Sequence, residues 1–385
     1  MALKVLNITE EGRGGGPLKR IEDVAHTLLN QDVETTVLFP NKNAEEFRAA
    51  LMQKSVPYIE TSLHRLTKDK IPLLMYVLTF IPEILKLIRI IKKNNFDIVL
   101  CNSSWQIKGV LASRFTKAKS IWIQNDSYQA SSVKKLFNFV SKRADAFVFV
   151  SNRTKEFYAS INPKILDKPF VIIQSPVDTN KFSPKVDKQE SEYIKEEGIN
   201  VLSVGYINHN KGFDTLIRAI HEVNKKIKEK INFYIAGPAF DSQQEYYNML
   251  LHLQKELNVN NLKFLGMRKD IPFLLNSMEL YVCSSDFEAS PISVWEAMAS
   301  KLAVVSTDVG DVEDIFMQYK CGLVVPSKSP KKLAEGILQI VMDENLRKEL
   351  SIKARETSVK LFSVDSVASK YRNFYLRVNS ETDAT

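Results

Sequence analysis

Short apolar runs alternate along the chain with longer segments in which apolar residues recur at helical spacing. A short apolar run bounded by turn residues is typical of a buried strand, and strands that alternate with helices indicate a parallel α/β sheet. The first half of the chain contains KVLNI, TTVLF, DIVLCN, KSIWIQ, AFVFVS and FVIIQ. The second half contains INVLSVG, NFYIAG, LKFLG, LYVCSS, LAVVST and GLVVP.

The segments between these runs predict helices. They cover residues 17–30, 82–93, 132–143 and 152–160, and then 211–228, 242–257, 291–300, 311–318 and 330–342. A polar run with two prolines, 175–198, separates the two series and marks a domain boundary.

The pattern therefore predicts two doubly wound, Rossmann-like domains, 1–175 and 176–362, which face each other across a cleft. In such sheets ligands bind beyond the carboxyl ends of the strands. A last helical segment, within 363–385, is either a terminal helix of the second domain or one that returns to the first, followed by a frayed tail.

Composition is that of a soluble globular protein, with 385 residues, 44% hydrophobic and 25% charged. The net charge of +8 favours a negatively charged partner, such as a phosphorylated metabolite, an anionic membrane or nucleic acid. The basic residues do not form aromatic-interleaved clusters, so nucleic acid is not the expected partner. The cysteines, Cys101, Cys283 and Cys321, are widely spaced in apolar runs, which predicts buried thiols in a cytosolic protein.

The N-terminal residues lack the long apolar core of a signal peptide. The longest apolar region, 71–91, is interrupted by Pro72, Pro82 and charged residues, which predicts a surface or core helix and argues against a membrane span.

The helix predicted over 82–93 places isoleucine and leucine on one face and lysine and arginine toward another. It is either an ordinary domain helix or one that docks on anionic lipid. Because Arg65, Lys68 and Lys70 are nearby in the sequence, we expect a cytoplasmic protein in peripheral contact with the inner face of the membrane.

A glycine cluster, EGRGGGPLKRI, follows the first predicted strand. Its spacing differs from G-x-G-x-x-G, and the second strand is not followed by the acidic residue that would bind an adenosine ribose, so a nicotinamide cofactor is disfavoured. The cluster is either a flexible connection or a place of close backbone approach to a ligand. Since Pro17 suits a first helical position, we expect Gly15 and Gly16 to contact the ligand and Arg13 to add positive charge.

In the second half, SVGYINHNKGFDTLIRAI places Lys211 at a strand-to-helix turn. A lysine beside the positive end of a helix suits a diphosphate, although a solvated loop lysine would look the same in isolation.

Downstream, FEASPISVWEA holds two glutamates, Glu288 and Glu296, separated by seven residues. Ser290 is the expected N-cap of a helix and Pro291 its first residue. The free amides at this helix start would form a second anion site, and Glu296, one turn on, can accept hydrogen bonds from the two hydroxyls of a ribose. The amides of this first turn belong to Ile292, Ser293 and Val294.

Together the glycine loop, VGYINHNKGFDTLIRAI, FEASPISVWEAMASKLAVVSTDVGDVEDI and GLVVPSKSPKKLAEGI resemble the retaining glycosyltransferase family 4, which has the GT-B fold. The resemblance implies that Glu288 contacts the donor sugar, Glu296 the ribose and Lys211 the diphosphate of a nucleotide sugar, and Glu288 and Lys211 are the expected catalytic residues. It further implies that phosphate lies on the amides of Ile292 and Ser293, and the base against Met267 and Arg268.

Two positions depart from the family pattern. Many relatives carry arginine where this chain has Tyr206, so Arg13 or His209 would have to supply a phosphate charge. Many also carry histidine where Asn125 stands, next to Asp126, at the expected sugar and acceptor site; a contact from asparagine would be neutral.

The predicted activity is transfer of a hexose-type sugar from a UDP- or GDP-sugar to a glycan or lipid-linked acceptor in cell-surface polysaccharide synthesis. Stabilisation of the departing diphosphate is the main task of the protein in such a reaction. No metal-binding spacing occurs, so no metal or other cofactor is expected. The alternatives are a nucleotide-sugar epimerase of the same fold, which would need an acid/base pair, and a non-enzymatic nucleic-acid-binding protein.

Overall fold

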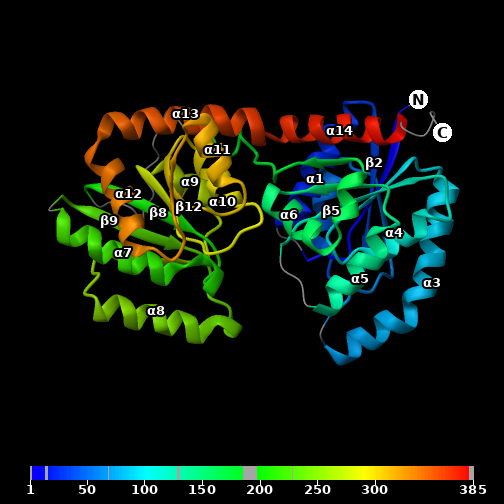
Figure 1. Cartoon of the computed structure of the whole chain (residues 1–385), viewed down its shortest axis with the longest axis horizontal. Helices are drawn as coiled ribbons and strands as arrows, with labels where there is room; N and C mark the ends of the chain where they lie inside the picture. Colours follow the sequence, from blue (N-terminus) through cyan, green and yellow to red (C-terminus); the bar gives the residue numbers. More distant parts are fainter. Residues whose placement is uncertain are drawn as a thin grey trace. The chain divides into compact units, whose positions relative to one another are not determined.

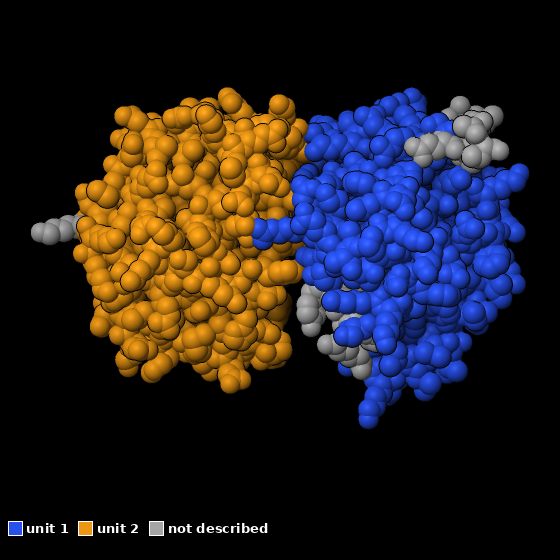
Figure 2. Space-filling view, in the orientation of Figure 1, with its two compact units in different colours: residues 1–176, 364–385 blue, residues 177–363 orange. Residues whose placement is uncertain are grey.

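The computed structural model describes residues 2–13, 16–67, 69–127, 131–184, 197–227 and 229–380. It divides the chain into two compact units (Figure 2): unit 1 is Met1–Pro176 with Val364–Thr385, and unit 2 is Val177–Ser363. These limits lie one residue from those expected from the sequence. Half of the polar run expected at the boundary, residues 185–196 of 175–198, lies outside the described residues.

Unit 1 contains a parallel sheet in the order β3-β2-β1-β4-β5-β6-β7. Its strands are β1 (Leu3–Ile8), β2 (Val33–Pro40), β3 (Tyr58–Thr61), β4 (Ile98–Cys101), β5 (Lys119–Gln124), β6 (Ala146–Phe149) and β7 (Phe170–Ile172). Its helices are α1 (Gly16–Leu29), α2 (Glu45–Gln53), α3 (Lys70–Asn94), α4 (Ile107–Ser113), α5 (Ser131–Ser141), α6 (Asn152–Ile161), the short η1 (Pro163–Asp167) and α14 (Val364–Ser380).

Successive residues of the central strands of unit 1 face opposite sides of the sheet, so each strand contributes side chains to two hydrophobic cores, one on each face. In β4, Ile98 belongs to the core shared with α1 and α14, and Val99 to the core shared with α3 and α4. The C-terminal helix α14 packs on unit 1 through Tyr371, Phe374 and Tyr375, beside α1 (Figure 1). This is the returning arrangement of the two that the sequence left open.

Unit 2 also contains a parallel sheet, with the strand order β10-β9-β8-β11-β12-β13. Its strands are β8 (Ile199–Val204), β9 (Ile231–Ala236), β10 (Leu262–Gly266), β11 (Leu280–Cys283), β12 (Ala303–Thr307) and β13 (Leu323–Val325). Its helices are η2 (His209–Lys211), α7 (Phe213–Lys226), η3 (Asp241–Gln243), α8 (Gln244–Glu256), α9 (Ile271–Asn276), α10 (Ile292–Ala299), α11 (Val312–Tyr319), α12 (Pro330–Met342) and α13 (Glu344–Phe362).

The predicted fold class, two Rossmann-like parallel α/β domains, is confirmed. The three cysteines are free and buried, as predicted. Among the strands and α-helices, the sequence missed β3, α2, α4, α9 and α13. β3 is a short edge strand with only partly apolar residues, and α13 is largely polar, so neither has a strong periodic signal.

The helix predicted over 82–93 is wrong at its start, because α3 begins at Lys70 and continues through Pro82. A proline inside a helix removes one hydrogen bond but is tolerated where the helix bends, and α3 curves along the edge of unit 1 in Figure 1. Among the described residues, α3 is the one helix long and apolar enough to cross a membrane, by length and composition only.

Candidate functional site

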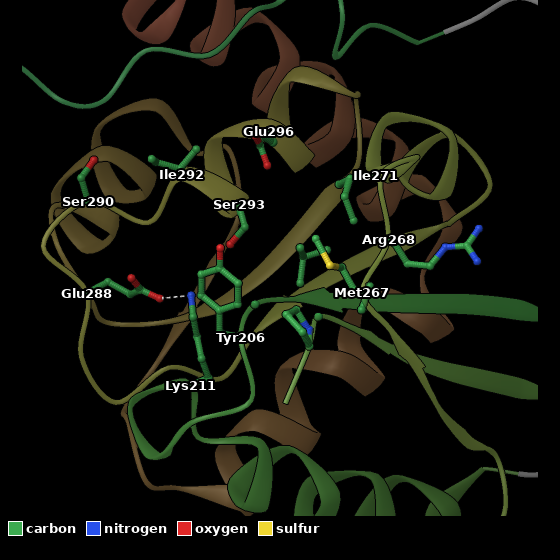
Figure 3. Close-up of a pocket in the computed structure, with 15 residues that line it drawn as sticks. Tyr206, Lys211, Met267, Arg268, Ile271, Glu288, Ser290, Ile292, Ser293 and Glu296 are labelled. Carbon is green, nitrogen blue, oxygen red and sulfur yellow. Dashed lines mark hydrogen bonds and ion pairs between the residues drawn. The ribbon is translucent and has the colours of Figure 1, made fainter. Parts of the chain in front are cut away.

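The carboxyl ends of β8, β9, β10 and β11 surround a pocket of about 410 Å³ in unit 2 (Figure 3). The strand order reverses between β8 and β11, which is where open α/β sheets bind ligands. Residues singled out from the sequence make up most of its lining: Tyr206, Lys211, Met267, Arg268, Glu288, Ser290, Ile292, Ser293 and Glu296. Pro291 is not part of the lining.

Lys211 ends the short helix η2, directly before the turn into α7. The turn residue Gly212 has φ +58°, a conformation that favours glycine. Gly205 leaves room for the lysine stem, since a Cβ there would lie 2.7 Å from the Lys211 Cε atom. The ammonium group is thereby held over the pocket.

Lys211 Nζ and Glu288 Oε1 form an ion pair at 2.5 Å (Figure 3). Ser285 Oγ donates a second hydrogen bond to the same carboxylate oxygen at 3.0 Å. Burial lowers the pKa of Lys211, but the charge of Glu288 outweighs burial and leaves the pKa raised. Without ligand, the two residues expected to do the chemistry therefore neutralise each other.

The helix start beyond Glu288 differs from the prediction. Helix α10 begins at Ile292, and its N-cap is Pro291, so the assignment of Ser290 as N-cap is wrong. The Ser290 hydroxyl instead accepts a hydrogen bond from Trp295 Nε1 at 3.3 Å. Proline fixes the backbone at the cap, and serine turns inward to satisfy a buried indole.

The amides of this turn are also less open than predicted. The Ile292 amide donates to the Ser290 carbonyl at 3.0 Å, and the Val294 amide to the Pro291 carbonyl at 2.9 Å. Within the described part of the chain, the Ser293 amide meets no backbone acceptor outside its own helix. An anion at this end of α10 would therefore depend mainly on Ser293.

Glu296 lines the pocket one turn into α10. Burial raises its pKa to about 7, although the nearby Lys181 and Lys211 oppose the shift. The sequence did not single out Lys181, because it lies in the polar run at the domain boundary. A carboxyl group with this pKa changes its charge across the physiological range.

Tyr206 and Met267 also line the pocket, and Phe240 lies beside Tyr206. Tyr206 and Phe240 are both about half exposed, and their ring centroids are 5.1 Å apart. The Met267 side chain is exposed, which leaves flat, accessible surface for a base. Phe240 was missed because it follows a strand of unit 2 in a loop without any motif.

The cation expected to replace arginine at Tyr206 does not come from His209, whose ring packs on Tyr246 with centroids 4.0 Å apart. Arg268 lines the pocket, but its guanidinium is paired with Asp270 at 2.5 Å and turns away from Lys211 (Figure 3). Among the lining residues described, Lys211 is the one lysine.

Unit 1 has a pocket of about 340 Å³ at the ends of β1, β4 and β5. Asn125 and Asp126 line it, together with Glu10, Asn102 and Trp105, which belong to no recognisable sequence motif. Gly15 lies outside the described residues, and Gly16 is the exposed first residue of α1.

Arg13 forms an ion pair with Glu11 at 2.8 Å and is largely exposed. This contact raises the pKa of Arg13 and lowers that of Glu11 to about 2, so the positive charge expected from Arg13 already has a partner.

The expectation of a neutral site at Asn125 is incomplete. Arg20 of α1 donates to Asn125 Oδ1 at 2.9 Å and to Asn102 Oδ1 at 3.1 Å, so a buried guanidinium stands beside the asparagine. Asp126 accepts hydrogen bonds from Tyr158 at 2.6 Å and Ser104 at 2.9 Å, while burial raises its pKa. Both side chains are thus held in fixed orientations toward the pocket.

Glu10 is almost fully buried, and its carboxylate oxygens accept no hydrogen bond from the described residues. Lys108 lies 3.7 Å away but is committed to Glu83 at 2.6 Å. Burial therefore raises the pKa of Glu10 to about 8. A protonated Glu10 can donate as well as accept, which suits a hydroxylated ligand.

This environment makes a testable prediction about stability. The unfolded chain loses the Glu10 proton near pH 4.5, whereas the folded protein keeps it until about pH 8, so Glu10 lowers the stability progressively between these values. Glutamine carries no such proton, and the melting temperature of Glu10→Gln relative to wild type should rise as the pH is raised from 5 to 8. Thermal denaturation at both pH values measures this, with exposed Glu46→Gln as the control. A difference that does not grow with pH would contradict the assignment.

Two models of known families match the chain. One described as glycosyl transferases group 1 matches residues 185–357, and one described as glycosyltransferase family 4 matches residues 14–181. The sequence is 28% identical over 253 residues to the N,N'-diacetylbacillosaminyl-diphospho-undecaprenol alpha-1,3-N-acetylgalactosaminyltransferase of Campylobacter jejuni, covering 64% of each chain. It is 24% identical over 238 residues to a lipopolysaccharide core biosynthesis mannosyltransferase of Rhizobium meliloti, covering 60% of this chain and 65% of the relative. Each match spans less than two thirds of the relative's length.

Solved structures share the fold. Anabaena HepE in complex with UDP superposes with a TM-score of 0.82 over 97% of this chain and 100% of HepE, at 17% identity. A Rickettsia africae glycosyltransferase gives 0.80 over 98% of both chains, at 21% identity.

Proposed function

Because the chain belongs to glycosyltransferase family 4, we propose that it is a retaining enzyme that transfers a hexose-type sugar from a UDP- or GDP-sugar to a lipid-linked or polysaccharide acceptor. One observation carries the proposal most directly: the unit 2 pocket brings Lys211, Glu288 and Glu296 together at the start of α10. A cation, a helix end and two carboxylates match the diphosphate, sugar and ribose of one nucleotide sugar.

In the proposed complex the diphosphate takes over the Lys211 ammonium from Glu288. Lys211 and the Ser293 amide then stabilise the negative charge that grows on the leaving phosphate as the bond from the anomeric carbon to the phosphate oxygen breaks. Glu288, released from the ion pair, accepts hydrogen bonds from the sugar hydroxyls. Glu296 accepts from the ribose, and the base lies by Met267 and the Tyr206–Phe240 pair.

The acceptor oxygen bonds to the anomeric carbon on the face that the diphosphate leaves, which retains the configuration. Its proton passes to the departing phosphate, so no separate base is required. Since Lys211 and Ser293 supply the positive polarity, we propose that the reaction proceeds without a metal ion.

We place the acceptor at the unit 1 pocket. Its lining offers hydrogen-bonding groups, Asn125, Asp126 and Glu10, beside the indole of Trp105, a combination that suits a sugar ring. The names of the Campylobacter jejuni and Rhizobium meliloti relatives include diphospho-undecaprenol and a lipopolysaccharide core, which supports an acceptor of the cell-surface class.

Titration calorimetry with UDP, GDP and a short oligonucleotide tests the donor class. We expect one diphosphate to bind and the oligonucleotide not to bind, and tight oligonucleotide binding without diphosphate binding would refute the proposal. A screen of UDP- and GDP-sugars for released nucleotide, with and without EDTA, then identifies the donor. A product that keeps its nucleotide and differs only in sugar configuration would indicate the epimerase instead.

A further inference from the structure

The first half of α3 exposes an apolar face that none of the described residues of unit 1 covers. Leu74, Val77, Leu78, Ile81 and Leu85 follow the helical spacing i, i+3, i+4, i+7 and i+11, so they lie on one side. Val77 and Leu78 are each 63% exposed and Ile81 is 60% exposed. A contiguous exposed apolar stripe of this kind marks an interaction surface.

The other side of α3 is fixed to the protein. Tyr76, Ile84, Leu87 and Ile91 are buried, and buried Glu83 forms an ion pair with Lys108 at 2.6 Å. In the segment before Pro82, by contrast, most side chains are exposed and Tyr76 is the buried one. That segment, 70–81, has 12 residues and is roughly 18 Å long, too short to cross a bilayer, which requires about 20 residues.

Basic residues border the same face. Lys70 lies four residues before Leu74, and Arg89 lies four residues after Leu85, both at positions that continue the stripe, and both are exposed. The described acidic residues of this region are Asp69, at the N-cap, and Glu83, which is already paired. The charge pattern is that of a helix lying in an anionic interface.

An apolar pocket of about 590 Å³ adjoins the stripe. Ile81 and Leu85 belong to both, and Phe115, beyond α4, adds a 64% exposed aromatic ring. Arg114 and Arg143 also line this pocket. Hydrocarbon walls with guanidinium groups at the side fit a lipid, whose chains are apolar and whose headgroup is a phosphate.

We propose that the exposed face of α3 and the adjoining pocket bind the surface of an anionic phospholipid bilayer, with the first half of α3 immersed parallel to the membrane plane. The helix does not span the bilayer. This deepens the proposed function, because it places an enzyme with a lipid-linked acceptor on the membrane, but it stands on unit 1 alone and is tested without sugar transfer.

Vesicle flotation tests the proposal. The full-length protein should float with phosphatidylcholine vesicles that contain phosphatidylglycerol. The triple variant Leu74→Ser, Val77→Ser, Leu78→Ser should lose more than about tenfold in vesicle affinity. The matched control, Met249→Ser with Leu251→Ser on the exposed side of α8 in unit 2, should float like wild type.

The pocket makes a separate contribution. Arg114→Gln with Arg143→Gln should weaken binding to phosphatidylglycerol vesicles by about fivefold per arginine and leave the weaker binding to pure phosphatidylcholine unchanged. A second measurement does not depend on variants that lose binding, and so guards against a loss caused by altered folding. The fluorescence of a tryptophan introduced by Leu78→Trp should be quenched by brominated lipid, whereas that of a tryptophan introduced by Leu251→Trp should not.

Three results would overturn the proposal: no flotation of the wild type, flotation of the triple variant equal to wild type, or a wild-type dimer in sedimentation that the triple variant abolishes. The last would assign the face to a second copy of the chain. Diphosphate binding by the triple variant should equal that of wild type, so a failure of the membrane proposal and a failure of the glycosyltransferase proposal are distinguishable.

Discussion

Replacing Lys211 by methionine is expected to lower sugar transfer by about 100- to 1000-fold, the loss typical when one charge-stabilising group is removed from a reacting centre. The described pocket lining offers no second lysine, and the Arg268 guanidinium is held by Asp270, so no other cation of this lining replaces the ammonium. Methionine keeps an unbranched apolar stem beside Gly205, so the change removes charge with little change in packing.

The variant also leaves Glu288 without its cation. Because both side chains are mostly buried, this should cost about 1–3 kcal/mol of stability. The double variant Lys211→Met, Glu288→Gln should recover stability, since glutamine carries no charge, but not transfer. Exposed Lys225→Met on α7 is the control for a lost surface charge. Transfer by the double variant near the wild-type rate would contradict the role of Lys211.

The second large effect concerns Glu296. Its pKa of about 7 means that roughly a tenth of the protein carries the ionised group at pH 6 and roughly nine tenths at pH 8. In the proposed complex the ionised carboxylate accepts from both ribose hydroxyls, so affinity for the donor should increase up to about tenfold between these values. In Glu296→Gln the affinity should be weak and independent of pH.

Calorimetry with an intact nucleotide sugar measures this, because its diphosphate lacks a terminal group that titrates in this range. Glu288→Gln is the matched comparison: it should keep the pH dependence of binding and lose mainly transfer. Together the two variants separate ribose binding from sugar chemistry. Unchanged binding and kinetics in both would refute the division of roles between the two glutamates.

The tyrosine at position 206 affects how the pocket can bind the donor diphosphate. Where an additional arginine would hold the diphosphate, this pocket has Tyr206, whose ring lies beside Phe240, and its one described lysine is bound to Glu288. Donor affinity should therefore depend more on contacts to the base and ribose than on phosphate charge. This follows from the loss of one charge-assisted contact.

The sequence by itself determined the two α/β domains, because their central strands are buried on both faces and appear as continuous apolar runs. The sequence also predicted that Lys211, Glu288 and Glu296 share one pocket, since all three lie in the loops or near the helix starts that follow strands at the carboxyl edge of one sheet. The position of a residue relative to its strand is sufficient to predict this, because a parallel sheet brings the carboxyl ends of all its strands to the same edge.

Only the tertiary structure decided the pairings between distant residues. Arg20 reaches Asn125 across 105 positions, Glu288 pairs with Lys211 across 77, and Glu10 is left buried beside a lysine committed to Glu83. These pairings set charge and pKa, and they depend on which side chains the packed core brings together and excludes from water. The exposed face of α3 has the same origin: its apolar residues were visible in the sequence, but only packing showed which of them the protein leaves uncovered.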